Sequence, residues 1–496
     1  MAAITMAKSG QDDIGAMSEF GVRQVVTGLR RAGEAVQTAV PDLERVIRLG
    51  VTGLSRSGKT VFITSLVAGL SNPETMVELV AAREGRIKAV DLKPHPEGTI
   101  PRFPFEDHLR TMVSRDNPAW PSGTKRLSKL RLSLRVQRNS RDWLGRLEET
   151  VHLDIVDFPG EWLIDLTMMD KDFVSWSVEC LKRITFEALD NRKEAMTYLE
   201  RLKRINSDAK FNEEDAQSLA RTFTTYLKSL KINGYSRCTP GWFLQPGDLE
   251  NAAVLTFGPL YPRDKAVKES LYKKFEDRFE GYKKQVIQPF FENHLSKIDR
   301  QVVLVDVMAA IEAGPGPFED QRKAMKDILS IFQPGQNLWL TQLFQGHKVE
   351  KILFAATKAD HLHHSQHGKL STYPDGVLRE SVQRAGDKGA KTKVMSIAAL
   401  RVTKEQNWTE DNINHQGVCG LLPGEDGSRR RWWFNYPGEL PDIGGLLQEA
   451  GKGEKEWRRD EPMVFPKFLP EPRSREQPLP HIRLDKALEF LIGDLL

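Results

Sequence analysis

The octapeptide Gly53-Leu-Ser-Arg-Ser-Gly-Lys-Thr60 matches the pattern GxxxxGK[ST], and it stands between a predicted strand at 45–51 and a predicted helix at 61–68. In such a unit the glycines let backbone N–H groups turn inward around a β-phosphate, Lys59 bridges the β- and γ-phosphates, and Thr60 ligates Mg²⁺. A glycine-rich turn of purely structural purpose is the alternative, but it gives no reason for a buried lysine. The pattern therefore predicts a nucleotide-phosphate site made by Gly53, Ser55, Arg56, Ser57, Gly58, Lys59, Thr60 and Val61.

A second cluster, Asp157-Phe-Pro-Gly-Glu161, follows a strand predicted from the alternation of apolar and polar residues at 151–156. An aspartate at a strand end can hold an Mg²⁺-bound water, and the N–H of Gly160 can contact a γ-phosphate. Asp306, which follows the apolar run 302–305, is a rival for the metal. We prefer Asp157, because it is the one followed at the right distance by a flexible glycine able to sense a γ-phosphate.

The other metal-binding and catalytic residues are predicted from their distance along the chain to these clusters. A switch threonine that completes the Mg²⁺ shell should lie shortly before the first strand of an antiparallel pair, which favours Thr124 over Thr99. Glu161 either orients the attacking water or caps a helix that follows, and the sequence favours neither role. The predicted metal ligands are Thr60, Asp157 and Thr124, and the predicted catalytic residues are Lys59, Gly160 and Glu161.

A third cluster, Thr357-Lys-Ala-Asp360, follows a predicted buried strand at 349–356 and so lies at the carboxyl edge of a sheet, where α/β proteins bind ligands. A carboxylate there can accept hydrogen bonds from guanine N1–H and the exocyclic amino group, while the Lys358 stem lies along the base. Backbone N–H groups of Ser396-Ile-Ala398, at the end of the next strand, are predicted to reach guanine O6. The predicted base-binding residues are Thr357, Lys358, Asp360, Ser396, Ile397 and Ala398.

The composition excludes several classes of protein. The 496 residues carry a net charge of only +4, so sequence-independent nucleic-acid binding is not expected. Three scattered cysteines encode neither a disulfide framework nor a thiolate zinc site. We expect neither a transmembrane helix nor a signal peptide, because no apolar run approaches the ~18 residues of a membrane span and residues 1–13 lack the short apolar core of a signal peptide. We expect a cytoplasmic protein that reaches a membrane only through a partner.

The order of predicted elements indicates an α/β fold. Its sheet is mostly parallel, with one antiparallel pair formed by residues 130–136 and 151–156, and a large all-α insertion interrupts it. A Pro- and Arg-rich excursion with little periodicity fills 71–124 and is expected to form loops. The predicted segments are an arm with an amphipathic helix at 1–40, a first part of the P-loop nucleotide-binding domain at 41–162, a helical insertion at 163–300, a second part of the same domain at 301–401, an irregular insertion at 402–480 and a C-terminal helix packing on the sheet at 481–496.

Two further patterns allow more than one interpretation. Four histidines, His361, His363, His364 and His367, suggest a metal, with His363 and His367 at i, i+4 spacing, but the cluster offers no carboxylate and directly follows the base-binding Asp360. Arg429-Arg-Arg-Trp-Trp433 could stack nucleic-acid bases. A strand with snorkelling arginines is the preferred interpretation, given the near-neutral charge of the chain.

Taken in this order, the segments LGVTGLSRSGKT, DFPGEW and TKADH resemble those of a Ras-like P-loop GTPase and, over most of the chain, the bacterial YcjX-like stress-protein family. The resemblance implies GTP or GDP and Mg²⁺ as ligands, slow GTP hydrolysis, a role in bacterial stress beside an inner-membrane partner, and a partner surface on the helical insertion or the switch loops. Thr357 replaces the usual Asn and Glu161 the usual water-orienting Gln. An ATPase of the same architecture and a nucleotide-stabilised scaffold are the alternatives.

Overall fold

The computed structural model describes residues 44–54, 57–138, 147–189, 192–332, 349–385, 390–410, 413–424, 430–452, 463–474 and 477–496. The predicted arm at 1–40, with its amphipathic helix, lies outside these residues, as do Ser55 and Arg56 of the phosphate loop. No helix among the described residues has both the length and the apolar character needed to cross a membrane.

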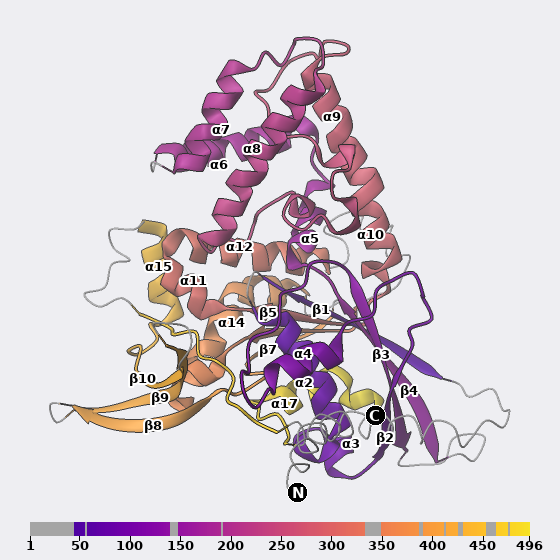
Figure 1. The fold of residues 1–496 in the computed structure, drawn as a ribbon, viewed down its shortest axis with the longest axis vertical. Coiled ribbons are helices and arrows are strands. Elements are labelled where there is room, and N and C mark those ends of the chain that lie inside the picture. The colour runs from indigo at the N-terminus through magenta and orange to yellow at the C-terminus, as the bar shows by residue number, and fades with distance from the viewer. Residues whose placement is uncertain are drawn as a thin grey trace, which may run out of the picture.

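A seven-stranded sheet in the order β2-β3-β4-β1-β5-β6-β7 forms the centre of the fold (Figure 1). Four neighbouring pairs, from β4–β1 to β6–β7, are parallel, and β3 runs antiparallel to both β2 and β4. The predicted class, a mostly parallel α/β sheet with the antiparallel pair β3–β4, is confirmed. The strands are β1 (Arg45–Gly53), β2 (Ile87–Lys93), β3 (Ser128–Gln137), β4 (Glu148–Asp157), β5 (Arg300–Val305), β6 (Lys351–Ala356) and β7 (Lys391–Ser396).

The edge strand β2 was not predicted, and the excursion at 71–124 is more regular than expected. It contains α3 (Val80–Arg83), β2 and α4 (Phe105–Met112). Most side chains of β2 are half-exposed, because the strand pairs on one side alone, with β3. An edge strand of this kind needs little apolar alternation, so its sequence carries little of the signal by which strands are predicted.

Alternate residues of the central strands pack on opposite faces of the sheet, as the pleat dictates. Val302 and Leu304 of β5 belong to the core that includes α2 (Lys59–Ser71) and α17 (Leu484–Ile492). Val303 and Val305 belong to the core on the other face, with α11 (Val307–Ala313), α12 (Pro315–Ile331) and α14 (His367–Ala385). The C-terminal helix therefore packs on the sheet as predicted, with buried Leu484, Ala487, Leu488, Leu491 and Ile492.

Helices rise from the carboxyl edge of the sheet between β4 and β5 (Figure 1). They share an aromatic core in which the Trp176 ring packs edge-on against Phe223 and Phe257. One of these helices begins after Asn212, whose side-chain oxygen accepts hydrogen bonds from the backbone N–H groups of Glu214 and Asp215. The helices are α5 (Gly160–Ile164), α6 (Phe173–Leu189), α7 (Lys193–Arg204), α8 (Glu213–Ile232), α9 (Leu271–Tyr282) and α10 (Gln288–Asn293).

The segment expected to be irregular, 402–480, instead contains a second sheet, and that expectation was wrong. Strands β8 (Thr403–Glu410), β9 (Ile413–Pro423) and β10 (Arg430–Asn435) pair antiparallel in the order β10-β9-β8, followed by α15 (Ile443–Lys452). The Arg-Arg-Trp-Trp stretch lies in β10, which is the strand interpretation. Frequent charged residues and glycines in these strands hid the alternation that a prediction needs.

Candidate nucleotide-binding site

The segments singled out in the sequence meet at the carboxyl edge of the parallel strands. Strand register aligns Val51 of β1 with Asp157 of β4, and Ala356 of β6 with both Val305 of β5 and Ser396 of β7. Ligands of α/β proteins bind at this edge. We call the part formed by residues 53–60, 124 and 157–161 the phosphate side, and the part formed by 357–360 and 396–398 the base side.

The start of α2 presents free backbone donors to the phosphate side. Gly58 has a φ of 84°, a left-handed conformation that favours glycine, and α2 begins directly after it without a side-chain cap or an acid in its first turn. Since the first intrahelical bond runs from Phe62 N–H to the Gly58 carbonyl, the preceding N–H groups have no helical acceptor. The Ser57 hydroxyl is buried and has no hydrogen-bond partner among the described residues. These orphaned donors fit a bound phosphate.

Asp157 is the centre of the phosphate side. Its carboxylate is 2% exposed, and the Lys59 Nζ lies 3.2 Å from Oδ1. The Thr124 hydroxyl donates to the same carboxylate, 2.9 Å from Oδ2. The hydroxyl of Thr60, the residue after Lys59, donates to the Ser122 carbonyl at 3.3 Å. The structure thus brings Lys59, Thr124 and Asp157 into contact, with Thr60 next to Lys59.

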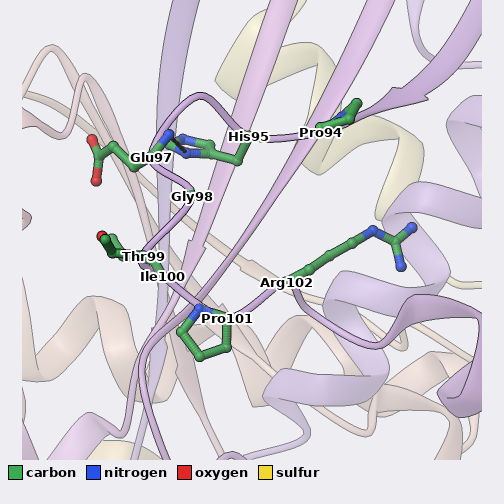
Figure 2. Close-up of a pocket in the computed structure, with 8 residues that line it drawn as sticks. All are labelled: Pro94, His95, Glu97, Gly98, Thr99, Ile100, Pro101 and Arg102. Atoms are coloured by element: carbon green, nitrogen blue, oxygen red, sulfur yellow. Dashed lines mark hydrogen bonds between the residues drawn. The ribbon is translucent and has the colours of Figure 1, made fainter.

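The side chains of the phosphate side fit Mg²⁺. Thr60 and Thr124 offer hydroxyl oxygens and Asp157 offers a carboxylate, and Mg²⁺ prefers hard oxygen ligands completed by water and phosphate. Of the two threonines considered for the Mg²⁺ shell, Thr124 and Thr99, it is Thr124 that contacts Asp157. Thr99 lines a different hollow of about 390 Å³, formed by the loop 94–102 between β2 and α4 (Figure 2).

Gly160 packs directly on the phosphate loop. A Cβ atom at this position would lie 2.0 Å from the carbonyl oxygen of Gly53, so no other residue fits without moving the backbone. Gly160 is also the first residue of α5, where the backbone N–H groups are not used by the helix itself. Its contact with Gly53 therefore links the start of the helical segment to the phosphate site.

Glu161 has a partner that neither sequence interpretation included. Its Oε1 lies 2.5 Å from the Nζ of Lys231, in the last turn of α8, and the Glu161 side chain is 11% exposed. The backbone of Glu161 also packs against Gly241, where a Cβ atom would lie 2.6 Å from the Glu161 carbonyl. Glu161 is an acid in the first turn of α5, as the capping role requires, and it also forms an ion pair with the helical segment.

Asp306 is engaged elsewhere. Its carboxylate accepts a hydrogen bond from Ala309 N–H at the start of α11 and forms an ion pair with Lys358. Lys59 instead contacts Asp157, which agrees with the choice of Asp157 over Asp306. The Lys358 ammonium is therefore anchored beside the sheet edge. The backbone of Lys358 is in the left-handed region, with a φ of 61°.

On the base side, the predicted side chains lie together but several are bonded to the chain itself. Both the N–H and the hydroxyl of Thr357 donate to the Val305 carbonyl, at 2.9 and 3.3 Å. Asp360 is 4% exposed, and its Oδ2 accepts a hydrogen bond from Val402 N–H at 2.9 Å. One carboxylate oxygen is thus bonded to the chain itself.

The prediction for Ser396-Ile-Ala398 needs correction. Ile397 N–H donates to the Ala356 carbonyl at 2.8 Å, and Ala398 N–H donates to Ile482 at 3.0 Å. The Ser396 hydroxyl donates to the His367 carbonyl and accepts from Arg483. These groups fix the end of β7 to the segment before α17, so in this arrangement they are not the donors that would read guanine O6.

Sequence reasoning missed three residues of this edge. Val402 and Arg483 hold the base side through the hydrogen bonds just described. His108, on α4, lies in the field of Asp157, which favours its protonation, but burial dominates and lowers its pKa. Val402 and Arg483 act through tertiary pairing and His108 lies in a segment expected to be loop, so no local pattern marked them.

Comparison with known proteins places the chain among relatives along nearly its whole length. The YcjX-like family, DUF463, matches residues 47–496. A protein of Escherichia coli K12 named Ras-like GTPase YcjX is 34% identical over 470 residues, covering 92% of this chain and 97% of the relative. One of Shewanella oneidensis with the same name is 31% identical over 479 residues, covering 91% and 95%. With the nucleotide-binding segments gathered at one sheet edge, this chain belongs to the YcjX-like family.

Proposed function

We propose that this protein binds GTP and GDP with Mg²⁺, hydrolyses GTP slowly, and acts as a nucleotide-state switch in the bacterial stress response. The observation that carries the proposal is the convergence of Lys59 and Thr124 on the buried carboxylate of Asp157 beside the uncapped start of α2. The names of the two relatives support the GTPase assignment. We expect the protein to act in the cytoplasm, together with a protein partner.

Lys59 has a different partner in each state of this site. Without nucleotide it neutralises the buried charge of Asp157, which would be costly to leave unpaired. With nucleotide its ammonium group turns to the β- and γ-phosphates, while Thr60, Thr124 and Asp157 hold the cation or its water. The Mg²⁺ neutralises charge on the phosphate oxygens when bound. Binding therefore redistributes charges that are already present, so Thr124 is expected to move with it.

Gly160 and Glu161 connect the phosphate site to the helices. The Gly160 backbone contacts Gly53, and Glu161 is paired with Lys231 on α8. If the Gly160 N–H binds a γ-phosphate, as proposed, Gly160 and Glu161 move with that phosphate. The ion pair between Glu161 and Lys231 then transmits this movement to α8. In other nucleotide switches, contacts with the γ-phosphate order the switch loops, and hydrolysis releases them. The helical segment is thus where we expect a partner to read the nucleotide state.

We expect slow hydrolysis if the Glu161 carboxylate leaves its ion pair with Lys231 to face the attacking water. A carboxylate can orient the attacking water, but it places negative charge near a γ-phosphate that accumulates negative charge. An arginine that compensates this negative charge raises the rate of GTP hydrolysis by a factor of about 10³ to 10⁵. Arg102 is paired with Glu106 in this structure, so Arg126, Arg56 or an arginine of the partner is the preferred source.

Competition binding tests the base preference. The full chain is titrated with a fluorescent GTP analogue in the presence of Mg²⁺, and unlabelled GTP, GDP and ATP are added as competitors. We expect GTP and GDP to displace the analogue and ATP to do so weakly, since adenine lacks the N1–H and amino donors for Asp360. Equal displacement by ATP would favour the ATPase alternative. Partner binding that is the same with GDP and with a non-hydrolysable GTP analogue would favour the scaffold.

A further inference from the structure

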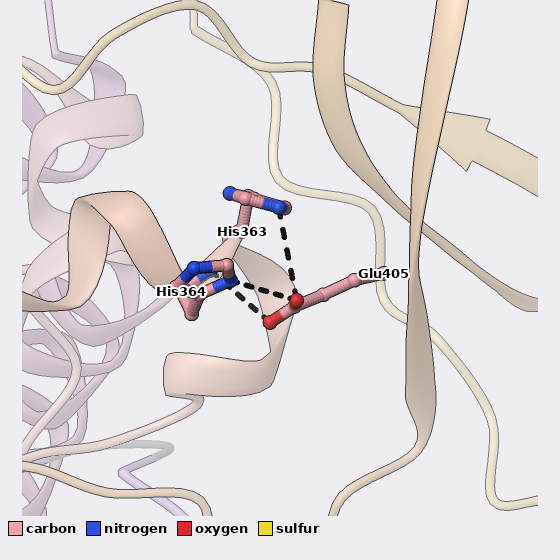
Figure 3. A group of neighbouring side chains, drawn as sticks. All are labelled: His363, His364 and Glu405. Atoms are coloured by element: carbon pink, nitrogen blue, oxygen red, sulfur yellow. Dashed lines mark hydrogen bonds and ion pairs between the residues drawn. The ribbon is translucent and has the colours of Figure 1, made fainter.

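Two histidines and a glutamate from distant parts of the chain converge beside the base side. His363 and His364 lie in the loop between β6 and α14, and Glu405 projects from β8 (Figure 3). The His364 Nδ1 lies 2.8 Å from Glu405 Oε2, and the His363 Nε2 lies 3.7 Å from the same oxygen. All three ligand atoms lie within 4.8 Å of one another.

This arrangement replaces the metal site considered from the sequence. The i, i+4 pair His363 and His367 does not converge, because His367 begins α14 and uses both ring nitrogens, accepting from Arg483 and contacting the Leu362 carbonyl. His361 is buried with its ring edge-on to Phe468. The carboxylate that the histidine cluster lacked in the sequence is supplied by tertiary structure.

The orientation of His363 suits a metal ligand. Its Nδ1 lies 2.9 Å from the Ser365 hydroxyl, which leaves Nε2 directed toward Glu405. Metal-ligating histidines commonly donate their second ring N–H to a fixed acceptor. The Ser365 hydroxyl can accept that bond when Nδ1 gives up the long bond, 3.4 Å, that it accepts from the Ser365 N–H in this structure. The side chain of His363 is 7% exposed, so its position is set by packing before any ligand arrives.

The spacing of the three atoms suits a small divalent cation. Tetrahedral zinc ligands at about 2.0–2.1 Å lie roughly 3.3 Å from each other. The two distances to Glu405 Oε2, 2.8 and 3.7 Å, lie on either side of that separation. The exposed side chain of His364 leaves the group open to solvent, so an ion can enter and a water can complete the shell.

We propose that His363, His364 and Glu405 form a binding site for a divalent cation of the zinc class, with three protein ligands and one position open to water. Imidazole nitrogens with one carboxylate suit Zn²⁺, Co²⁺ and Ni²⁺, whereas Mg²⁺ prefers oxygen ligands alone. The site is thus chemically distinct from the phosphate side, and it stands whether or not the proposed function is correct.

A bound cation joins the loop after Asp360 to the second sheet. The two are already in contact, since Val402 N–H and the Thr403 hydroxyl donate to Asp360, and His364 N–H donates to Glu405. Coordination adds bonds between the same segments and stabilises the folded chain, which has the site, over the unfolded chain, which lacks it.

Metal titration of the nucleotide-free full chain, without a histidine tag and after chelator treatment, tests the proposal. Co²⁺ is the spectroscopic probe and Zn²⁺ the competitor. We expect one Co²⁺ per chain with the visible absorption of a four-coordinate site, displaced by one Zn²⁺, and a higher melting temperature with Zn²⁺. Glu405→Gln and the exposed His364→Ala should each weaken binding by more than about tenfold, the loss that even indirect partners of a metal produce.

His415→Ala is the matched control, because His415 lies on the neighbouring strand β9 and contacts Trp408 and Tyr436. It should leave metal affinity unchanged. Equal affinity in the wild type, Glu405→Gln and His364→Ala would show that the metal binds elsewhere and would overturn the proposal. So would the absence of stoichiometric binding in the wild type, which would leave the cluster as an ordinary histidine–glutamate ion pair.

Discussion

The phosphate side and the base side of the same sheet edge differ in what holds their key groups. On the phosphate side, the Ser57 hydroxyl has no partner among the described residues, and the backbone N–H groups at the start of α2 have no helical acceptor. On the base side, the donors of Ile397 and Ala398 are bonded to Ala356 and Ile482. The proposed phosphate site is thus formed by local backbone, whereas the proposed base site depends on segments from the far end of the chain.

The largest expected effect is on the phosphate side. Lys59→Ala should lower GTP affinity by more than about 100-fold, since it removes the cation for the β- and γ-phosphates. It also leaves Asp157 unpaired, so Lys59→Ala/Asp157→Asn serves as the control for stability. Both variants should fail to bind GTP, and the double variant should recover the melting temperature.

The exposed Lys88, which donates to the Gly85 carbonyl, provides the matched lysine control. Lys88→Ala should bind GTP like the wild type. If Lys59→Ala, while folded, binds and hydrolyses GTP normally, the phosphate side is assigned wrongly, and the contrast between the two sides collapses.

A smaller effect is expected on the base side. Asp360→Asn should weaken GTP binding by about 10- to 100-fold and shift preference toward XTP, because an amide donor can face the C2 oxygen of xanthine. Val402 N–H must keep its bond to the remaining side-chain oxygen for this exchange to work. Competition of labelled GTP by XTP in both proteins measures the shift. An unchanged XTP preference would mean that Asp360 serves only to hold Val402.

The comparison also explains how much the sequence predicts. Short patterns and strand ends predict that Lys59, Thr60 and Asp157 lie at one sheet edge, and the position of Thr124 just before β3 predicts that it lies there too. The bonds to Ile482 and the approach of Glu405 to His364 join residues far apart in sequence, which no local pattern encodes. The edge strand β2 and the second sheet were missed for a different reason, because their strands are rich in polar residues and show little apolar alternation.

The free energy of unfolding is expected to depend on pH through Asp165, which lies where the phosphate side meets the helices. Asp165, just after α5, is fully buried, and burial raises its pKa from 3.8 to about 8, although hydrogen bonds from Tyr282 and Gly241 oppose the rise. The folded protein therefore keeps a proton that the unfolded chain loses. The contribution of Asp165 to stability should be fully present below its usual pKa of 3.8 and should fall by at most about 1.4 kcal/mol per pH unit until the pH passes about 8.

Denaturant unfolding of wild type and Asp165→Asn across this pH range measures the effect. Asparagine stays neutral, so the variant should lack this contribution, and the difference between the two proteins should change steadily with pH. A constant difference would mean that Asp165 is ionised in the folded protein throughout.

The smallest expected effect concerns the ion pair between Glu161 and Lys231. A double-mutant cycle of Glu161→Gln and Lys231→Met should give a coupling energy of about 0.5–1 kcal/mol, because the pair is only partly buried. The exposed pair of Asp107 and Arg110 is the control, with a coupling near zero. Coupling that differs between the GDP state and a GTP-analogue state would support transmission to α8, and identical coupling in both states would argue against it.

The most direct test of the central claim is the Mg²⁺ dependence of GTP affinity in the wild type, Asp157→Asn and Thr124→Val. If Asp157 and Thr124 hold the cation, GTP affinity should rise strongly with Mg²⁺ in the wild type, and both variants should lose most of that rise while remaining folded. The same rise with Mg²⁺ in all three proteins would contradict the assignment of Asp157 and Thr124 to the metal.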